Sequence, residues 1–316
     1  MVRRGLLLFP KPGDSYREDF AVIVDHVRRV APELQVKVAH EAEPPEDFAA
    51  EFRGLPTLVV SFRHAVPVPV PGRVFCCRYI PKPRQLRRYA QAGVPFPPAR
   101  MFHWGLKLDP AIWGPFVVMK PIKPGTMSHG TVHLIPTSLL HRLKPQHFAP
   151  RHPIHDGPML LQRFVDTGER PIHYRVLTLF GEPLYAMSIM LKQPRPPLSA
   201  PVNHLLAAQI ASNAGPRDRI MIAEPEILEF ARAMSRALPD VPLQGLDIIR
   251  EKATGRVFAL ESNPGGNTWH FSSEFAVKMR EEMGDGRNIL LNQFNALERA
   301  AKVLARQVEL YAKQGP

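Results

Sequence analysis

The sequence predicts an α/β protein in which a small N-terminal layer of parallel strands precedes a larger α+β part. Over the first 80 residues, strand-like and helix-like segments alternate, which is the pattern of a parallel sheet. After Pro81 the pattern changes, and later strands are joined by short turns, as in antiparallel hairpins. The 316 residues, 45% of them hydrophobic, are enough for two domains or one large composite domain.

The N-terminal layer is predicted from short apolar runs separated by turn residues. Residues 6–9 form a buried-strand pattern that Pro10 ends, whereas residues 35–39 alternate like a half-buried strand. Prolines interrupt residues 66–70, which predicts an edge or a linker at that place. The expected elements are strands at 6–9, 35–39, 57–61 and 73–79, and helices at 15–30 and 45–52.

The larger part is predicted to contain two hairpins and a closing helix. Residues 181–183 and 253–255 are turn sequences between apolar strands. The apolar stripe of residues 292–312 fits packing on its own domain, with a dimer seam as the alternative. The expected strands are 116–120, 131–135, 159–165, 175–180, 184–190, 244–250 and 257–263, and the helices are 83–92, 225–238 and 292–312.

Positive charge is concentrated in one segment. Residues 52–155 contain 15 lysines and arginines, eight histidines and one acidic residue, Asp109. Such a face attracts anions, such as nucleotide phosphates or an acidic or phosphorylated substrate, although it also fits a solvated surface without a partner. Nucleic acid is not favoured, because no basic stretch carries the interleaved aromatic residues that stack on bases.

Two observations bear on localisation. No apolar run approaches the ~20 residues that cross a bilayer, so no membrane association is expected. The only cysteines, Cys76 and Cys77, are adjacent and are interpreted as strand residues of a protein in a reducing compartment. These features predict a cytoplasmic protein.

The last hairpin carries the strongest chemical signal. Asp247 lies among apolar neighbours on one strand, and Glu261 and Asn263 share a face of the returning strand. Two buried carboxylates need a partner, and oxygen ligands suit Mg²⁺ bound together with phosphates. The alternatives are an exposed hairpin face, or carboxylates that pair with arginines such as Arg175.

A second signal is the strand that ends at Lys120 and the loop after it. Gly125 and Gly130 flank small hydroxyl residues, so backbone N–H groups there can approach an anion closely. The loop lacks the Gly-Lys-Ser/Thr of a Walker motif.

In this order, the segments resemble the ATP-grasp superfamily of carboxylate–amine ligases over about two-thirds of the chain. The matching segments are Lys82 with Gly93-Val94-Pro95, Lys120-Pro121 through Gly130-Thr131-Val132, Gln162-Arg163-Phe164-Val165, His173-Tyr174-Arg175-Val176, 245–249 and 261–266. The resemblance implies an N-terminal pre-grasp domain at 1–80, a small lid subdomain at 81–158 and a C-terminal grasp subdomain at 159–316.

The resemblance also implies an ATP site between the two grasp subdomains. Adenine is expected against Phe164 and Val165, and the phosphates on Lys82 and Lys120. The expected nucleotide ligands are Lys82, Lys120, Gly125, Thr126, Gly130, Gln162, Arg163, Phe164, Val165, and for the ribose Asp166 or Glu169. Asp247, Glu261 and Asn263 are expected to hold one or two Mg²⁺ or Mn²⁺ ions, and Arg175 and Lys120 to face the transferred phosphoryl group.

The implied activity is ATP-dependent activation of a carboxylate as an acylphosphate, which an amine then attacks to form an amide. The alternatives are a kinase or thiol ligase on the same scaffold, or a non-catalytic binder of nucleotide or an acidic partner. Three residues depart from the family pattern, Arg163 for glutamate, His173 for aspartate and His129 for glycine.

Weaker features remain open. Asn213, Trp269 and His270 are candidate substrate contacts, with core packing as the alternative for Trp269 and His270. A zinc site at His147, His152, His155 and Asp156 is a minor possibility, because the spacing is irregular and the segment is rich in proline.

Overall fold

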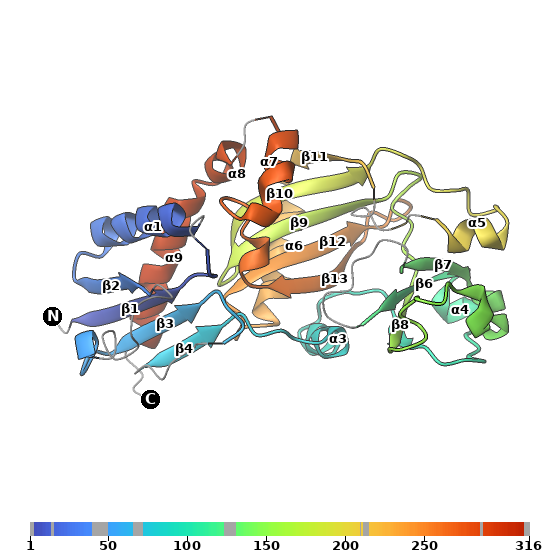
Figure 1. Ribbon diagram of the computed structural model, residues 1–316, viewed down its shortest axis with the longest axis horizontal. Coiled ribbons are helices and arrows are strands. Elements are labelled where there is room, and N and C mark those ends of the chain that lie inside the picture. The colour runs from blue at the N-terminus through green and yellow to red at the C-terminus, as the bar shows by residue number, and fades with distance from the viewer. Residues whose placement is uncertain are drawn as a thin grey trace.

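The computed structural model describes residues 3–13, 16–39, 50–65, 72–122, 131–208, 210, 215–284 and 287–312. These residues form three sheets that follow one another along the longest axis of the molecule (Figure 1). One is parallel and lies at the N-terminal end, and two are antiparallel. This is the α/β and α+β architecture that the sequence predicted.

The parallel sheet has the strand order β2-β1-β3-β4. Its strands are β1 (Arg4–Phe9), β2 (Leu34–Val38), β3 (Thr57–Ser61) and β4 (Arg73–Cys76), with helix α1 (Arg17–Val30) between the first two. All were predicted, although β4 is shorter than expected. Residues 45–49 of the predicted short helix and the proline-interrupted segment 66–70 lie outside the described residues.

Strand β1 is buried on both faces. Leu6 and Leu8 pack toward α1 and the closing helix α9 (Ala296–Tyr311), whereas Leu7 and Phe9 pack against Phe52 on the other side. Figure 1 shows α1 and α9 side by side over this sheet. The apolar stripe of α9 is therefore an internal surface, and its packing on its own chain is confirmed over the dimer-seam alternative.

The central sheet has five antiparallel strands in the order β11-β10-β9-β12-β13. They are β9 (Ile172–Leu179), β10 (Glu182–Leu191), β11 (Arg217–Met221), β12 (Leu243–Arg250) and β13 (Val257–Pro264). Helix α6 (Pro225–Arg236) covers one face through Ile227, Ala231 and Met234. Helices α7 (Val277–Glu282), α8 (Asn288–Gln293) and α9 lie on the other face, where Met279, Leu290 and Leu304 join the core of the N-terminal sheet.

The third sheet, with the order β5-β8-β6-β7, forms a separate small core at the other end of the molecule. It consists of β5 (Ala99–Met101), β6 (Phe116–Pro121), β7 (His133–Pro136) and β8 (Met159–Arg163), with helix α4 (Pro110–Trp113) and the short turns 137–142 and 145–147 beside it. Helix α3 (Lys82–Gln91) precedes it, and α5 (Val202–Leu206) reaches over from the central sheet to pack on β7. The elements β5, α4, α5, α7 and α8 were not predicted because they are short. Strand β11 was not predicted either, because Arg217-Asp218-Arg219 has no apolar alternation.

A buried polar network fixes α3 against the last hairpin. Gln85 of α3 accepts a hydrogen bond from the Ser262 N–H (2.7 Å) and donates to the Ser262 carbonyl (2.9 Å). The Ser262 hydroxyl donates to Gln244 Oε1 (3.0 Å), and the amide of Gln244 donates to four oxygen atoms between Ser235 and Val241. Because buried amides are costly without partners, this network holds Lys82, at the start of α3, beside β13.

The predictions about membrane-spanning segments and about the cysteines can be compared with the structure. Within the described part of the chain, no helix combines the length and apolar character needed to cross a membrane. Cys76 is the last residue of β4 and Cys77 follows the strand, whereas both were expected in it; both are buried and form no disulfide.

Candidate functional site

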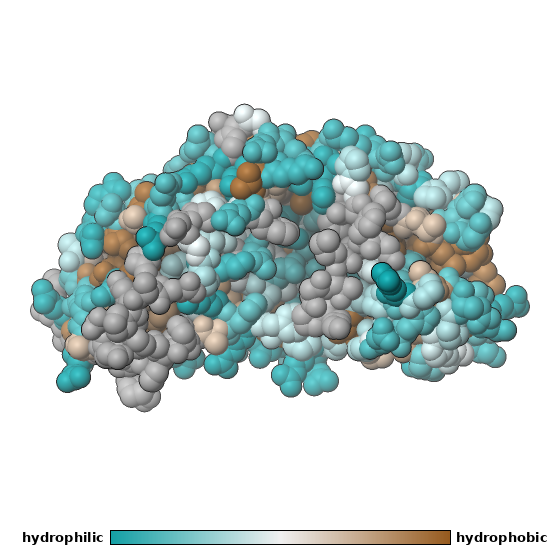
Figure 2. All heavy atoms as spheres, in the orientation of Figure 1, coloured by the Kyte–Doolittle hydropathy of each residue, from teal (hydrophilic) through white to brown (hydrophobic). Residues whose placement is uncertain are grey.

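A cavity opens between the small sheet and the central sheet, where the sequence predicted the nucleotide. The space between its walls, open solvent included, amounts to about 1100 Å³. The surrounding surface is mainly hydrophilic on the face seen in Figure 2. Of the predicted site residues, Lys82, Lys120, Gln162, Arg163, Phe164, Val165, Arg175, Asp247 and Glu261 line this one cavity.

The end of the lining that contains the two carboxylates holds Lys82, Lys120 and Arg175, and the end that contains the Phe164 ring is largely apolar but includes Arg195. The lining includes five lysines and arginines against two carboxylates, so its potential favours a polyanion. Apolar residues that the sequence analysis did not assign complete the largely apolar end: Val118, Val132, Ile172, Ile249 and Leu260.

A β-bulge brings the two carboxylates together. Asp247 pairs directly with Glu261, but Ile248 pairs with Ala259, so Leu260 is left unpaired. A bulge places consecutive residues on one side of a strand, and both Leu260 and Glu261 accordingly line the cavity. Simple alternation along the strand could not predict this position for Leu260.

Asn263 completes the predicted set from the next position on the same face. Its side-chain amide donates to Asp247 Oδ2 at 3.0 Å and lies 3.5 Å from Glu261 Oε1. The three side chains therefore converge, as their positions in the sequence predicted.

Both carboxylates are held by cations of this chain. Arg175 binds Asp247 through two hydrogen bonds, Nε to Oδ1 at 2.5 Å and Nη2 to Oδ2 at 2.9 Å. Lys82 Nζ lies 2.9 Å from Glu261 Oε2. Arginine pairing, which the sequence analysis kept as an alternative to a metal ion, is thus present at Asp247.

The charges shift the titration of the groups around them. Burial raises the pKa of Glu261, but Lys82, Lys120 and Arg175 outweigh it and lower that pKa to about 2. Burial and the neighbouring Lys82 lower the pKa of Lys120 to about 8. At neutral pH, Glu261 is therefore ionised and Lys120 is protonated but close to its titration range.

His173 stands where the resemblance expects an aspartate. Its Nε2 lies 3.5 Å from Asp247 Oδ1, and its side chain is 7% exposed. Burial lowers the pKa of His173 to about 4 in spite of the opposing effect of Asp247. The imidazole is consequently neutral at pH 7 and adds no charge beside the carboxylates.

Gln162 provides a donor without a partner at the apolar end. The side chain is 3% exposed, and its Nε2 makes no hydrogen bond with the described part of the chain. Gln162 pairs with Val118 in the small sheet, so both side chains face the cavity. A buried unsatisfied N–H is costly, and a ligand acceptor such as a ring nitrogen removes that cost.

Two predicted ribose ligands do not line the cavity. Asp166 accepts hydrogen bonds from the Gly168 N–H (2.9 Å) and Arg195 Nη2 (3.0 Å), and the Glu169 side chain is exposed. Arg195 itself lines the cavity, 5.8 Å from the Phe164 ring, and its buried Nε has no partner among the described residues. Arg163, which also lines the cavity, forms an ion pair with Glu251, with 3.6 Å between Nη2 and Oε1.

The weaker substrate candidates Trp269 and His270 are both buried. Trp269 is 1% exposed, packs on Phe20 and donates from Nε1 to Asp19 Oδ2 at 2.9 Å. His270 is 7% exposed and its Nδ1 lies 2.9 Å from the Tyr185 hydroxyl. Neither side chain lines the cavity. Gly125, Thr126, Gly130, His129 and Asn213 lie outside the described residues.

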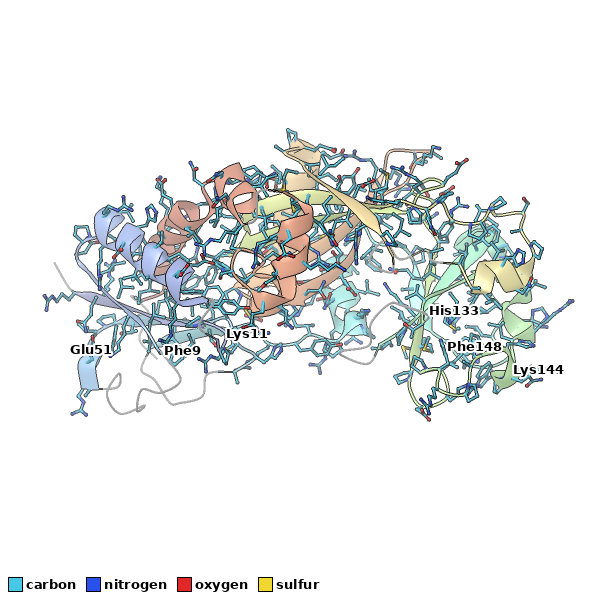
Figure 3. The ribbon with its side chains drawn as sticks, turned by 45° about the horizontal axis from the view of Figure 1, so that its top comes forward. Phe9, Lys11, Glu51, His133, Lys144 and Phe148 are labelled. Atoms are coloured by element: carbon cyan, nitrogen blue, oxygen red, sulfur yellow. The ribbon has the colours of Figure 1, made fainter. Side chains whose placement is uncertain are left out.

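The histidines of the small sheet form a pair rather than a metal site. His152 Nε2 lies 2.8 Å from His133 Nε2, and both rings pack on Phe148. Figure 3 shows His133 and Phe148 in this part of the molecule. Within the described part of the chain, no three or more His, Cys, Asp or Glu side chains are grouped to hold a metal ion. The zinc alternative is therefore wrong. Lys144, from the basic segment, is exposed at the outer end of this part (Figure 3).

The donor set on the last hairpin fits a magnesium ion better than a transition metal. Asp247 and Glu261 offer carboxylate oxygens and Asn263 an amide oxygen, which are the hard ligands that Mg²⁺ takes together with phosphates.

Comparison with known proteins identifies the fold. No protein-family model and no curated protein matches the sequence. Among solved structures, the chain is similar to the ATP-grasp ligase PsnB complexed with minimal precursor, with 14% identity, a TM-score of 0.52 and coverage of 96% of this chain and 99% of that chain. A PsnB complex with a phosphomimetic variant of minimal precursor, Mg and ADP is 12% identical, with a TM-score of 0.51 and coverage of 98% of this chain and 100% of that chain. The D-cycloserine synthetase DcsG is 16% identical, with a TM-score of 0.50 and coverage of 96% of this chain and 99% of that chain. These likenesses show that the chain has the ATP-grasp fold predicted from its motifs.

Proposed function

We propose that this ATP-grasp chain is an ATP- and Mg²⁺-dependent ligase that activates a carboxylate as an acylphosphate and joins it to an amine. The observation that carries the proposal is the single cavity between the two antiparallel sheets. It brings Lys82, Lys120, Gln162, Arg175, Asp247 and Glu261 together from six different elements. The structural neighbours support the same chemistry, since PsnB is named a ligase and DcsG a synthetase.

The residues divide the nucleotide between the two ends of the cavity. Phe164, Val165 and Ile249 offer apolar walls to the base, and the unpartnered Nε2 of Gln162 offers a donor to its edge. Lys82 and Lys120 are placed to bind the phosphates. We assign the loop that contains Gly125, Thr126 and Gly130 to the same phosphates from its sequence alone.

Asp247, Glu261 and Asn263 are the residues that would hold Mg²⁺. When bound, the ion supplies charge neutralisation to the phosphate oxygens and to the leaving group. A PsnB complex contains Mg and ADP, which supports this assignment.

The chemistry follows from charge. An ionised carboxylate is a poor electrophile, so one of its oxygens first attacks the γ-phosphorus, and the β–γ bond of ATP breaks to release ADP. An amine then attacks the acylphosphate carbon, phosphate leaves with the former C–O pair of electrons, and the nitrogen loses a proton. Arg175 and Lys120 would stabilise the negative charge on the transferred phosphoryl group, so positioning and electrostatics supply the catalysis.

Calorimetric titration of ATP tests the proposal, with and without Mg²⁺, on wild type and Glu261→Gln. We expect micromolar binding that requires Mg²⁺ and weakens at least 100-fold in the variant, because Glu261 both ligates the ion and positions Lys82. Arg236→Gln, on an exposed site of α6, is the matched control and should bind like wild type. No binding under any condition would exclude the ligase.

The alternatives separate in a second assay. ADP release that depends on a carboxylate and an amine supports the ligase. Release with hydroxyl or thiol acceptors alone would favour a kinase or thiol ligase. Nucleotide binding without ADP release from any acceptor panel would favour a non-catalytic binder.

A further inference from the structure

Two arginines at the edge of the central sheet face the same side as the candidate site. Arg219 of β11 pairs with Ile189, which pairs with His173, and Arg217 pairs with Leu191 at the end of the same ladder. Paired residues of antiparallel strands point to one face, and alternate residues of a strand share it. Arg217 and Arg219 therefore lie on the face of His173, opposite the face that α6 covers.

Of these two arginines, only Arg219 forms an ion pair with a described carboxylate. Arg219 binds Glu282 of α7, which lies over the same face (Figure 1). The Arg217 side chain makes no hydrogen bond or ion pair with the described part of the chain, and the same Glu282 is the carboxylate that acts on it. Partial burial and the neighbouring Arg219 lower the pKa of Arg217, which is how an arginine behaves when it lacks a counter-ion of its own.

Further groups near this pair belong to α7 and to the segment before it. Arg280 of α7 donates to two carbonyl oxygens, of His270 (2.9 Å) and Ser273 (2.8 Å), and adds a further positive charge. Burial and the charges of Arg175, Arg219 and Arg280 lower the pKa of His270 to about 3, so this ring is neutral. Arg217, Arg219 and Arg280 thus place three positive charges near β11 and α7, where Glu282 forms its ion pair with Arg219.

The pair is close to the reacting end of the cavity but separate from the nucleotide walls. His173 lines the cavity beside Asp247 and also experiences the charge of Arg217. Arg219 lies across β10 from His173, so their backbones are roughly 10 Å apart at about 4.8 Å per strand, whereas Arg175 lies across from Met221. Neither arginine lines the cavity itself, and a substrate that extends from Arg175 past His173 approaches Arg219 first and then Arg217.

We propose that Arg217 and Arg219 bind a second carboxylate of the substrate, so that the acid that is activated carries at least two. The proposal rests on the ligase function proposed above and names its substrate class. Guanidinium groups bind carboxylates with two parallel hydrogen bonds. An unpaired arginine near the proposed site of phosphoryl transfer is suited to this role. The second carboxylate belongs either to a free dicarboxylic acid or to an acidic side chain of a peptide.

Calorimetry in the presence of Mg²⁺ and the non-hydrolysable analogue AMPPNP tests the proposal. The first set of probes consists of succinate, glutarate and adipate, each against its monomethyl ester. The second set compares the tripeptides Glu-Glu-Glu and Gln-Gln-Gln. Wild type, Arg217→Gln, Arg219→Gln and the conservative Arg217→Lys are measured, with Arg236→Gln on the opposite face as the control. AMPPNP affinity and the urea unfolding midpoint of every variant are recorded separately.

We expect at least one acid to bind tenfold or more tightly than its neutral-ended counterpart, and both glutamine variants to abolish this preference. Arg217→Lys should keep part of it, and AMPPNP affinity should stay within twofold of wild type. A preference confined to the first set identifies a free dicarboxylic acid, and one confined to the second identifies a peptide. The proposal is overturned if wild type shows no preference in either set, or if the preference survives in both glutamine variants. Failure of AMPPNP to bind counts against the ligase function instead.

Discussion

The pKa values of Lys120 and Glu261 are both lowered by the charges that surround them. Lys82 contributes to both, since it lowers the pKa of Lys120 by repulsion and that of Glu261 by attraction. The result is an ionised carboxylate beside a lysine whose pKa, about 8, lies near neutral pH. A lysine in that range gives nucleotide binding a pH dependence that an unperturbed lysine would not.

The affinity for Mg·ATP should fall as the pH rises from 7 to 9. The nucleotide binds protonated Lys120, and the free protein loses that proton as the pH passes about 8, so the dissociation constant should rise about tenfold. Calorimetry at pH 7, 8 and 9 measures the effect. Lys120→Arg should flatten the profile, because guanidinium stays charged, and the exposed Lys144→Arg should leave it unchanged. An equal slope in Lys120→Arg would assign the effect to another group.

At the scale of elements, the last hairpin depends on close packing beneath its first strand. A Cβ atom added to Gly245 would lie 2.4 Å from Cγ2 of Thr268, in the turn that follows β13. Gly245 is two residues before Asp247 and pairs with Asn263, so strain there moves the carboxylate cluster directly.

Gly245→Ala should lower the free energy of unfolding by about 1–3 kcal/mol through overpacking, as measured by urea denaturation. Thr268→Ser in the same background removes Cγ2 and should restore part of that loss. Gly157→Ala is the control, because the nearest atom to its added Cβ is 3.4 Å away. Equal free energies of unfolding for Gly245→Ala and wild type would contradict this prediction and mean that Thr268 shifts without destabilising the fold.

The elements also show where sequence reasoning succeeds. Alternation along β13 predicted that Glu261 and Asn263 share a face, and the short turn placed Asp247 almost opposite Glu261. The direct pairing of Asp247 with Glu261 depends on the bulge at Leu260. The position of Leu260 was out of reach, because a bulge depends on pairing between strands. Strand β11 was missed because Arg217-Asp218-Arg219 has no apolar alternation, and only its pairing with β10 makes it a strand.

At the scale of the whole molecule, three buried histidines make the fold sensitive to acid. Burial lowers the pKa values of His152 and His173 to about 4 and that of His270 to about 3. In the unfolded chain the same groups titrate near 6.5, so between these limits the unfolded state binds more protons. Stability is therefore present above pH 6.5 and is lost as the pH falls toward 4.

Urea unfolding should show this loss between pH 7 and pH 5, at roughly 2 kcal/mol for each buried histidine. His152→Asn keeps an acceptor for the Ile154 N–H and should reduce the pH dependence, whereas the exposed His204→Asn should not. A wild-type protein equally stable at both pH values would contradict the assignment of neutral, buried imidazoles.

The overall organisation was only partly accessible from the sequence. Six motifs that occur in the order found in the ATP-grasp superfamily predicted the fold. The division of the chain at residues 80 and 158 stays a prediction. The packing of α9 on the N-terminal sheet was not predicted, since an apolar stripe identifies a buried face but not what covers it.

That packing has a consequence for how the protein is made. Strand β1 is synthesised long before α9, one of the two helices that cover its Leu6 and Leu8. At about 5–20 residues per second, the interval between the two segments is roughly 15–60 s. During that interval only α1 is present to cover this face, so part of the apolar surface of the sheet stays exposed until α9 has been synthesised.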